Sequence, residues 1–262
     1  MTLLRSKFDP GPRVRVEVEP YTALAQWYDE VMTHVDYLKW SMYITRITQY
    51  YHKQYHSILD FACGTGKLLM HLSDRGYHVV GVDGSREMVE RARRASMLRG
   101  KVIDFYVGDM RKKPPLDNQD MVLCLYDSVN YLMTVDDVNL FLTAVRLTLQ
   151  DEGMFIFDLS TEQNSLTNFT GYEDQDKITG GYFIRRSNYD PKKRIQHNVF
   201  ELYPDGEKEC YIEHHQQRIW PVLEMVDMLE DQGFRLLSVY DGMSFMPGSE
   251  ESDRVHIVAV PS

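Results

Sequence analysis

The feature that most constrains the fold is a regular alternation of short apolar segments and helical segments that begins at Ser57. The apolar segments are bounded by Gly, Asp or Asn, as buried parallel strands tend to be. The segments between them carry apolar residues at helical spacing. Alternating strands and helices predict a parallel sheet with helices on both faces and right-handed crossovers. The expected strands are 57–61, 78–82, 102–107, 120–125 and 153–157.

The alternation stops after Leu159. Three segments separated by turn residues then predict antiparallel strands, and a helical stripe and two final strands follow them. We therefore expect an α/β protein with a doubly wound, mostly parallel seven-stranded sheet. Residues 57–160 and 221–262 would form this core, and residues 161–220 a small antiparallel β insertion that serves as a lid on the substrate side. The antiparallel strands are expected at 181–189, 194–203 and 208–220, and the last two strands at 235–241 and 254–260.

Residues 1–56 are expected to form an N-terminal arm and a helical cap. Valines alternate with charged residues between the prolines of the first twenty positions, which predicts an edge strand or an extended arm. Two stripes of apolar residues at helical spacing follow, at 24–32 and 37–51.

Composition limits the classes of function. A chain of 262 residues with 43% hydrophobic content can form one large α/β domain with a small insertion. Its formal net charge of −10 argues against a nucleic-acid surface, which needs clustered Lys and Arg. The three cysteines form no CxxC pair, which suits a reducing cytoplasm and favours neither a disulfide nor a zinc site. Because no stretch approaches the roughly 18 apolar residues of a membrane span, we expect a cytoplasmic protein that is not in a membrane.

The loop after the first expected strand is the strongest functional signal. Small residues at 62–66 let the backbone approach a ligand, and the following helix offers free N–H groups. A phosphate-binding loop is excluded, because Leu68 follows Gly66-Lys67 where Ser or Thr is needed. A dinucleotide fingerprint would place its third glycine at Leu69, so this interpretation fails too.

The segment Asp60-x-Ala62-x-Gly64-x-Gly66 resembles the acidic residue and GxGxG motif of class I S-adenosylmethionine-dependent methyltransferases, with alanine in the first glycine position. Acidic residues at two later strand ends strengthen the resemblance. Asp83 can accept hydrogen bonds from both ribose hydroxyls, or it can merely cap the next helix. In the resembled family a residue placed like Asp109 accepts from the adenine amino group.

The N-terminal segment around Tyr21, Tyr28 and Trp40 is similar to the cap of small bacterial methyltransferases, which include sugar N,N-dimethyltransferases and glycine N-methyltransferases. In them an aromatic lid covers the cofactor, although simple core packing explains the same spacing. The resemblance implies S-adenosyl-L-methionine as cofactor, with S-adenosyl-L-homocysteine as product. The residues expected to bind it are Tyr21, Tyr28, Trp40, Asp60, Ala62, Cys63, Gly64, Gly66, Asp83, Gly84, Met88, Asp109, Met110 and Leu125.

The predicted reaction is an in-line methyl transfer to a nitrogen or oxygen of a small molecule. Such a reaction needs alignment, and for some acceptors a base that removes a proton. We select Asp127, Tyr131 and His214 as candidate catalytic residues, with His215 as the alternative to its neighbour. Adjacent strand residues point to opposite faces, so at most one of the two histidines faces the cleft.

The histidine pair offers too few ligands for a metal, so no metal site is expected. Glu213 and Arg218 are interpreted as a surface salt pair. The chain is expected to act as a monomer or a homodimer.

Two other functions remain open at this stage. A non-catalytic S-adenosylmethionine-binding protein, acting as a sensor or a partner subunit, would carry the same motifs. An NAD-dependent oxidoreductase is a weaker alternative, because it leaves Asp109 and the aromatic cap unexplained.

Overall fold

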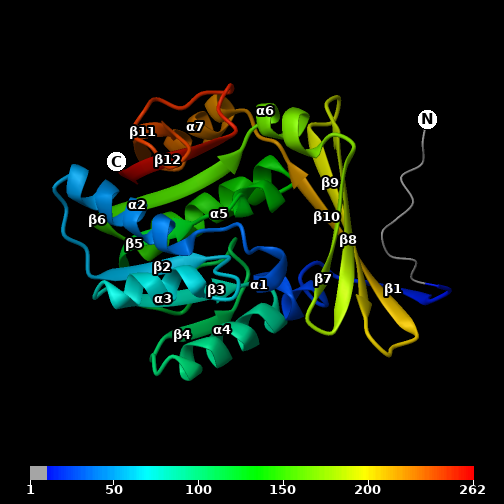
Figure 1. Cartoon of the computed structure of the whole chain (residues 1–262). Helices are drawn as coiled ribbons and strands as arrows, with labels where there is room; N and C mark the ends of the chain where they lie inside the picture. Colours follow the sequence, from blue (N-terminus) through cyan, green and yellow to red (C-terminus); the bar gives the residue numbers. More distant parts are fainter. Residues whose placement is uncertain (1–10) are drawn as a thin grey trace.

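The computed structural model describes residues 11–262, and residues 1–10 of the predicted arm lie outside the described residues. The chain forms two sheets, one of seven strands and one of five. Figure 1 shows the seven-stranded sheet between two layers of helices, with the five-stranded sheet standing beside it.

The seven-stranded sheet has the order β11-β12-β6-β5-β2-β3-β4. The five strands from β6 to β4 are parallel, and β12 runs antiparallel to both β6 and β11. The predicted doubly wound, mostly parallel sheet is therefore confirmed. The chain moves outward from β2 to β4 and then returns to β5 on the other side of β2, so the strand order reverses at β2. The strands are β2 (Ser57–Phe61), β3 (His78–Asp83), β4 (Asp104–Val107), β5 (Gln119–Cys124), β6 (Leu149–Ser160), β11 (Phe234–Asp241) and β12 (Arg254–Pro261).

Helices cover both faces of this sheet. On one face α5 (Val135–Thr148) and α7 (Val222–Asp231) pack on Phe155 and Phe157, whose rings stack at 4.6 Å. On the other face α2 (Tyr37–Tyr50), α3 (Lys67–Asp74) and α4 (Arg86–Leu98) bury a second apolar cluster. None of the helices within residues 11–262 is long and apolar enough to cross a membrane.

The second sheet has the order β1-β10-β9-β8-β7. The strands β10, β9, β8 and β7 form an antiparallel meander, and three of them (β8, β9 and β10) match the predicted insertion strands. The N-terminal β1 joins β10 in parallel as an edge strand. The edge strand β7 was not anticipated, because its exposed charged residues show no apolar alternation. The strands are β1 (Val14–Val18), β7 (Tyr172–Ile178), β8 (Gly181–Asp190), β9 (Ile195–Pro204) and β10 (Glu209–Arg218).

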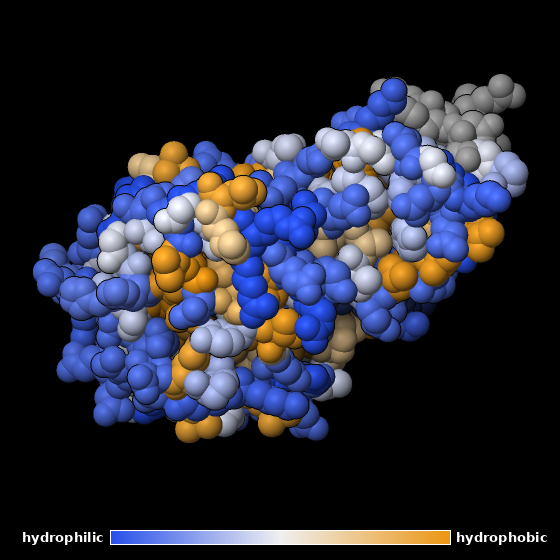
Figure 2. Space-filling model, turned by 90° about the horizontal axis from the view of Figure 1, so that it is seen from below, coloured by the Kyte–Doolittle hydropathy of each residue, from blue (hydrophilic) through white to orange (hydrophobic). Residues whose placement is uncertain are grey.

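Short helices connect the two sheets. The expected helix at 24–32 is instead divided into η1 (Leu24–Gln26) and α1 (Tyr28–Val31), which pack on the second sheet through Leu24 and Trp27. The other short helices are η2 (Ser128–Tyr131), α6 (Glu162–Asn164) and η3 (Ser165–Phe169). Figure 2 shows that the molecule is elongated, with apolar side chains on this face in small groups among polar ones.

The turn between β2 and α3 needs glycine for two different reasons. Gly64 and Gly66 both have left-handed φ angles, of 55° and 73°. An added Cβ on Gly66 would lie 2.7 Å from the ring of Phe105, whereas the space around Gly64 is open. Gly66 therefore lets α3 and β4 approach closely.

We predict that Gly66→Ala lowers the free energy of unfolding by about 2–4 kcal/mol, because left-handed strain and overpacking add. Gly64→Ala is the matched control with the same strain and no clash, and its expected loss is about 1–2 kcal/mol. Urea unfolding of both variants measures the difference. Equal losses would contradict the packing role of Gly66.

Candidate active site

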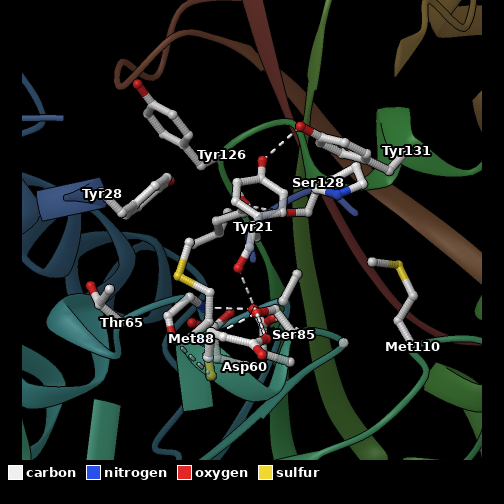
Figure 3. Close-up of a pocket in the computed structure, with 18 of the residues that line it drawn as sticks. Tyr21, Tyr28, Asp60, Thr65, Ser85, Met88, Met110, Tyr126, Ser128 and Tyr131 are labelled. Carbon is white, nitrogen blue, oxygen red and sulfur yellow. Dashed lines mark hydrogen bonds between the residues drawn. The ribbon is translucent and has the colours of Figure 1, made fainter. Parts of the chain in front are cut away.

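A cavity of about 620 Å³ lies at the carboxyl ends of the parallel strands, where the strand order reverses. This is where open α/β sheets bind ligands. Figure 3 shows side chains from the N-terminal segment and from four strand ends converging on it. The predicted cofactor residues that line it are Tyr21, Tyr28, Trp40, Asp60, Ala62, Cys63, Gly64, Asp83, Gly84, Met88, Met110 and Leu125.

Asp83 joins the glycine turn to the end of β3. One carboxylate oxygen accepts from the N–H of Gly64 and the other from the N–H of Ser85, each at 2.8 Å. The pKa of Asp83 is raised, because burial raises it by more than these two backbone hydrogen bonds lower it. Asp83 thus fixes the turn and the start of α4 while it also faces the cavity. Both interpretations of this residue, ligand contact and local cap, are compatible with its position.

Asp60 is the least satisfied polar group at the site. It is 4% exposed, and its Oδ1 is buried without a hydrogen-bond partner. Burial, with smaller contributions from the charges of Asp83 and Asp158, raises the pKa of Asp60 to about 8. A buried acceptor without a partner costs free energy in the ligand-free protein. A cation in the cavity would favour the charged form of this carboxyl, which belongs to the cavity wall.

The raised pKa of Asp60 predicts a stability that depends on pH. The folded protein binds this proton more tightly than the unfolded chain, so the contribution of Asp60 is full below about pH 4 and is lost as the pH rises through about 8. We therefore expect the ligand-free wild type to lose stability relative to Asp60→Asn between pH 5 and pH 8. Parallel urea titrations of the two proteins measure this difference. A constant difference across the range would contradict the raised pKa.

The N-terminal segment closes one side of the cavity as a lid. Asp29 accepts a hydrogen bond from Thr65 at 2.7 Å and pairs with Lys67 at 3.3 Å. The hydroxyl of Ser85 donates to the carbonyl of Tyr21 at 2.9 Å. These contacts tie the lid to the turns after β2 and β3.

The structure places Asp127 differently from its predicted catalytic role. Asp127 does not line the cavity, and its carboxylate accepts from Arg254 at 2.7 Å and from Gln217 at 2.5 Å. Arg254 also binds Asp158, whose Oδ1 accepts from the backbone N–H of Asp127 at 2.9 Å. A carboxylate in this ion-paired network is poorly suited to remove a proton. Its position instead orders the segment after β5.

The choice between the two histidines is corrected. His214 is exposed on the outer face of β10, where it pairs with Glu17 at 2.9 Å. His215 is buried on the inner face, and its Nδ1 lies 2.9 Å from the hydroxyl of Tyr131, a predicted catalytic residue that lines the cavity. The prediction that only one of the two histidines faces inward is correct, but the inward residue is His215 and not His214.

The interpretation of Glu213 and Arg218 as a surface salt pair is wrong. Glu213 is fully buried and accepts from the backbone N–H groups of Tyr21, Ala23 and Leu24, each at 2.7 Å. The guanidinium of Arg218 instead stacks 3.9 Å from the ring centre of Trp220. Glu213 therefore anchors the lid to the second sheet.

Two predicted cofactor residues do not line the cavity. Asp109 is bound to Arg111 at 2.9 Å, and this hydrogen bond lowers the pKa of Asp109. Gly66 packs behind the turn. Thr65 lines the cavity within the predicted 62–66 turn, although it is absent from the predicted set of binding residues. Further lining residues outside that set include Lys67, Ser85, Tyr126 and Ser128.

The fold and the site together define a doubly wound α/β protein with its ligand cavity at the switch point of the sheet. A family model described as a methyltransferase domain matches residues 58–153. A putative methyltransferase of Bacillus subtilis, YqeM, is 31% identical over 245 residues, which cover 92% of this chain and 97% of the relative. The chain belongs to the S-adenosylmethionine-dependent methyltransferases.

Solved structures agree with this fold. An S-adenosylmethionine-dependent methyltransferase from Clostridium acetobutylicum has a TM-score of 0.79 at 22% identity, covering 92% of this chain and 99% of that one. The sugar N-methyltransferase KedS8 from a Streptoalloteichus species has a TM-score of 0.72 at 19% identity, covering 89% and 92%. The predicted family, fold class and cofactor are confirmed.

Proposed function

We propose that the 620 Å³ cavity holds S-adenosylmethionine, with Asp83 binding the ribose hydroxyls and the Met88 and Met110 side chains beside the adenine. The observation that carries this assignment is Asp60, a buried carboxyl in the cavity wall whose Oδ1 has no hydrogen-bond partner. The cationic methionyl part would stabilise its negative form. Bound S-adenosylmethionine supplies a methyl group that its sulfonium activates for transfer. The protein's own task is to orient the two reactants and exclude water.

The assignment of Asp83 gives a direct prediction. Asp83→Ala should weaken binding of S-adenosylhomocysteine by about 1.5–3 kcal/mol, the range for hydrogen bonds to a charged group. Asp109→Ala is the comparison, and we expect unchanged affinity because Asp109 is outside the cavity lining. Titration calorimetry measures both variants. Unchanged affinity in a folded Asp83→Ala protein would contradict the ribose contact.

We also propose that the acceptor is a small molecule with a nucleophilic nitrogen or oxygen. Residues 161–220 would act as the substrate-side lid opposite the core of 57–160 and 221–262, with 1–56 as arm and cap. Aromatic side chains of the N-terminal segment, such as Tyr28 and Trp40, and of the loop after β5 surround the cavity. Such faces suit a sulfonium cation and a dry reaction space. The similarity to a sugar N-methyltransferase supports an amine acceptor.

A thermal-shift and methyl-transfer experiment tests this proposal. S-adenosylhomocysteine at 100 times its Kd should stabilise the protein by about 2.7 kcal/mol, or roughly 5–10 °C, whereas NAD should give no shift. Labelled methyl transfer is then measured with glucosamine, glycine and catechol, which represent sugar amines, amino acids and phenols. Transfer to glucosamine or glycine is the expected result. Stabilisation without transfer to any of the three would contradict the proposed acceptor class and favour a binding protein.

We propose finally that the protein works in the cytoplasm. The three cysteines are all free and buried, which is compatible with a reducing compartment.

A further inference from the structure

Four side chains form a hydrogen-bonded row that leads from the cavity into the second sheet. The hydroxyls of Tyr21 and Tyr131 are 2.6 Å apart, and both residues line the cavity. The Tyr131 hydroxyl is 2.9 Å from Nδ1 of His215, whose Nε2 is 3.0 Å from Oε2 of Glu213. Figure 3 shows the two tyrosine hydroxyls pointing toward each other above the cavity. The row joins residues from the lid, η2 and β10.

The partners of Glu213 fix the direction of these hydrogen bonds. Its Oε1 accepts from the N–H groups of Ala23 and Leu24, and its Oε2 accepts from the N–H of Tyr21. Three donors stabilise the negative charge of the buried carboxylate, which then has only acceptor sites to offer. The Nε2 of His215 must therefore carry a hydrogen and donate to Glu213. In a neutral imidazole this leaves Nδ1 as an acceptor.

The remaining bonds follow from that tautomer. Tyr131 donates its hydroxyl hydrogen to Nδ1 of His215, so Tyr21 donates to the oxygen of Tyr131. The Tyr21 oxygen can then accept a hydrogen bond from a group inside the cavity. Burial raises the pKa of both phenols well above the usual value, so neither tyrosine is an anion at neutral pH. The row is oriented to carry a proton away from the cavity.

We infer that Tyr21 and Tyr131 relay the proton of the methyl acceptor to His215, which Glu213 holds in the receptive tautomer. The inference rests on the proposed function, because it needs an amine or hydroxyl acceptor. As the carbon–sulfur bond breaks and its electron pair stays on sulfur, the bond between carbon and acceptor forms. The acceptor N–H or O–H bond then breaks, and its proton moves to the hydroxyl oxygen of Tyr21. The hydroxyl proton of Tyr21 moves to the oxygen of Tyr131, and the hydroxyl proton of Tyr131 moves to Nδ1 of His215. His215 ends as an imidazolium paired with Glu213.

The surroundings of His215 fit this role. The rings of Tyr21 and Phe200 pack edge-on against the imidazole at 4.8 and 5.2 Å and exclude water from it. The titratable groups that face it are Glu213 on its own strand, Tyr21 from the lid and Tyr131 from η2. The charge of Asp127 raises the pKa of Tyr131, and the charge of Arg185 lowers it. His215 is a positioning residue in this scheme, since it acts through the tyrosines.

The tautomer can be measured without knowing the acceptor. We expect long-range ¹H–¹⁵N correlation of the full chain with S-adenosylhomocysteine to show neutral His215 protonated at Nε2 at pH 7.5. The resonance is assigned by its loss in His215→Asn. Protonation at Nδ1, or at both nitrogens, would reverse or block the relay and would overturn the inference.

A kinetic comparison uses the neighbouring histidine as the matched control. In His215→Asn, the side-chain oxygen can still accept from Tyr131 but cannot take up a proton. With glucosamine as the probe, we expect kcat to fall roughly 10²-fold at pH 7 and to recover as the pH rises, with an unchanged KM. His214→Asn should behave as wild type, because His214 lies on the outer face.

The outcomes separate the inference from the proposed function. A His215→Asn protein with the wild-type kcat and pH profile would overturn the relay, whereas the acceptor class would stand. If the wild type does not methylate glucosamine, the amine-sugar proposal fails, and the tautomer measurement still decides whether the row is oriented as inferred.

Discussion

The buried carboxylate of Glu213 is the contact on which the assembly of the site depends. It accepts three backbone N–H groups of the lid and faces the Nε2 of His215. Because Glu213 lies on β10, the lid is held by the second sheet, while Ser85 and Thr65 hold it to the first. An unpaired carboxylate at zero exposure would be very costly, so the lid and the second sheet stabilise each other. The interaction that closes the cavity therefore also stabilises the fold.

The site concentrates backbone strain. Of the six non-glycine residues with positive φ within residues 11–262, four belong to the cavity rim or to the segment after β5: Tyr21, Ala62, Tyr126 and Asp127. Such conformations persist only where surrounding contacts fix them. At Asp127 the ion pair with Arg254 provides such a contact, and at Tyr21 the bonds to Glu213 and Ser85 do. The regular strands are rigid, and the strained turns that follow them direct side chains and peptide groups toward the cavity.

Sequence reasoning succeeded where the determining interactions are local. The core strands follow from short apolar segments, and the turn from Asp60 to Gly66 contains its own signal. It failed where a distant residue decides the outcome. The position of Asp127 after β5 suits a base, but Arg254 from β12 lies beside it. The inward face of β10 is set by packing against the lid, so the pattern alone cannot favour His215 over His214. Asp109 lies outside the cavity lining, and its carboxylate is paired with Arg111, a neighbour two residues away.

The pairing of β1 with β10 has a consequence for how the protein matures. β1 is synthesised long before its partner residues 209–213, which follow it in the chain by most of the core. The last strand, β12, then has to enter between β6 and β11. A nascent chain therefore contains the glycine turn long before it can close a lid over it. The lid can form its contacts with Glu213 only after β10 has been made, and until then β1 has no partner strand.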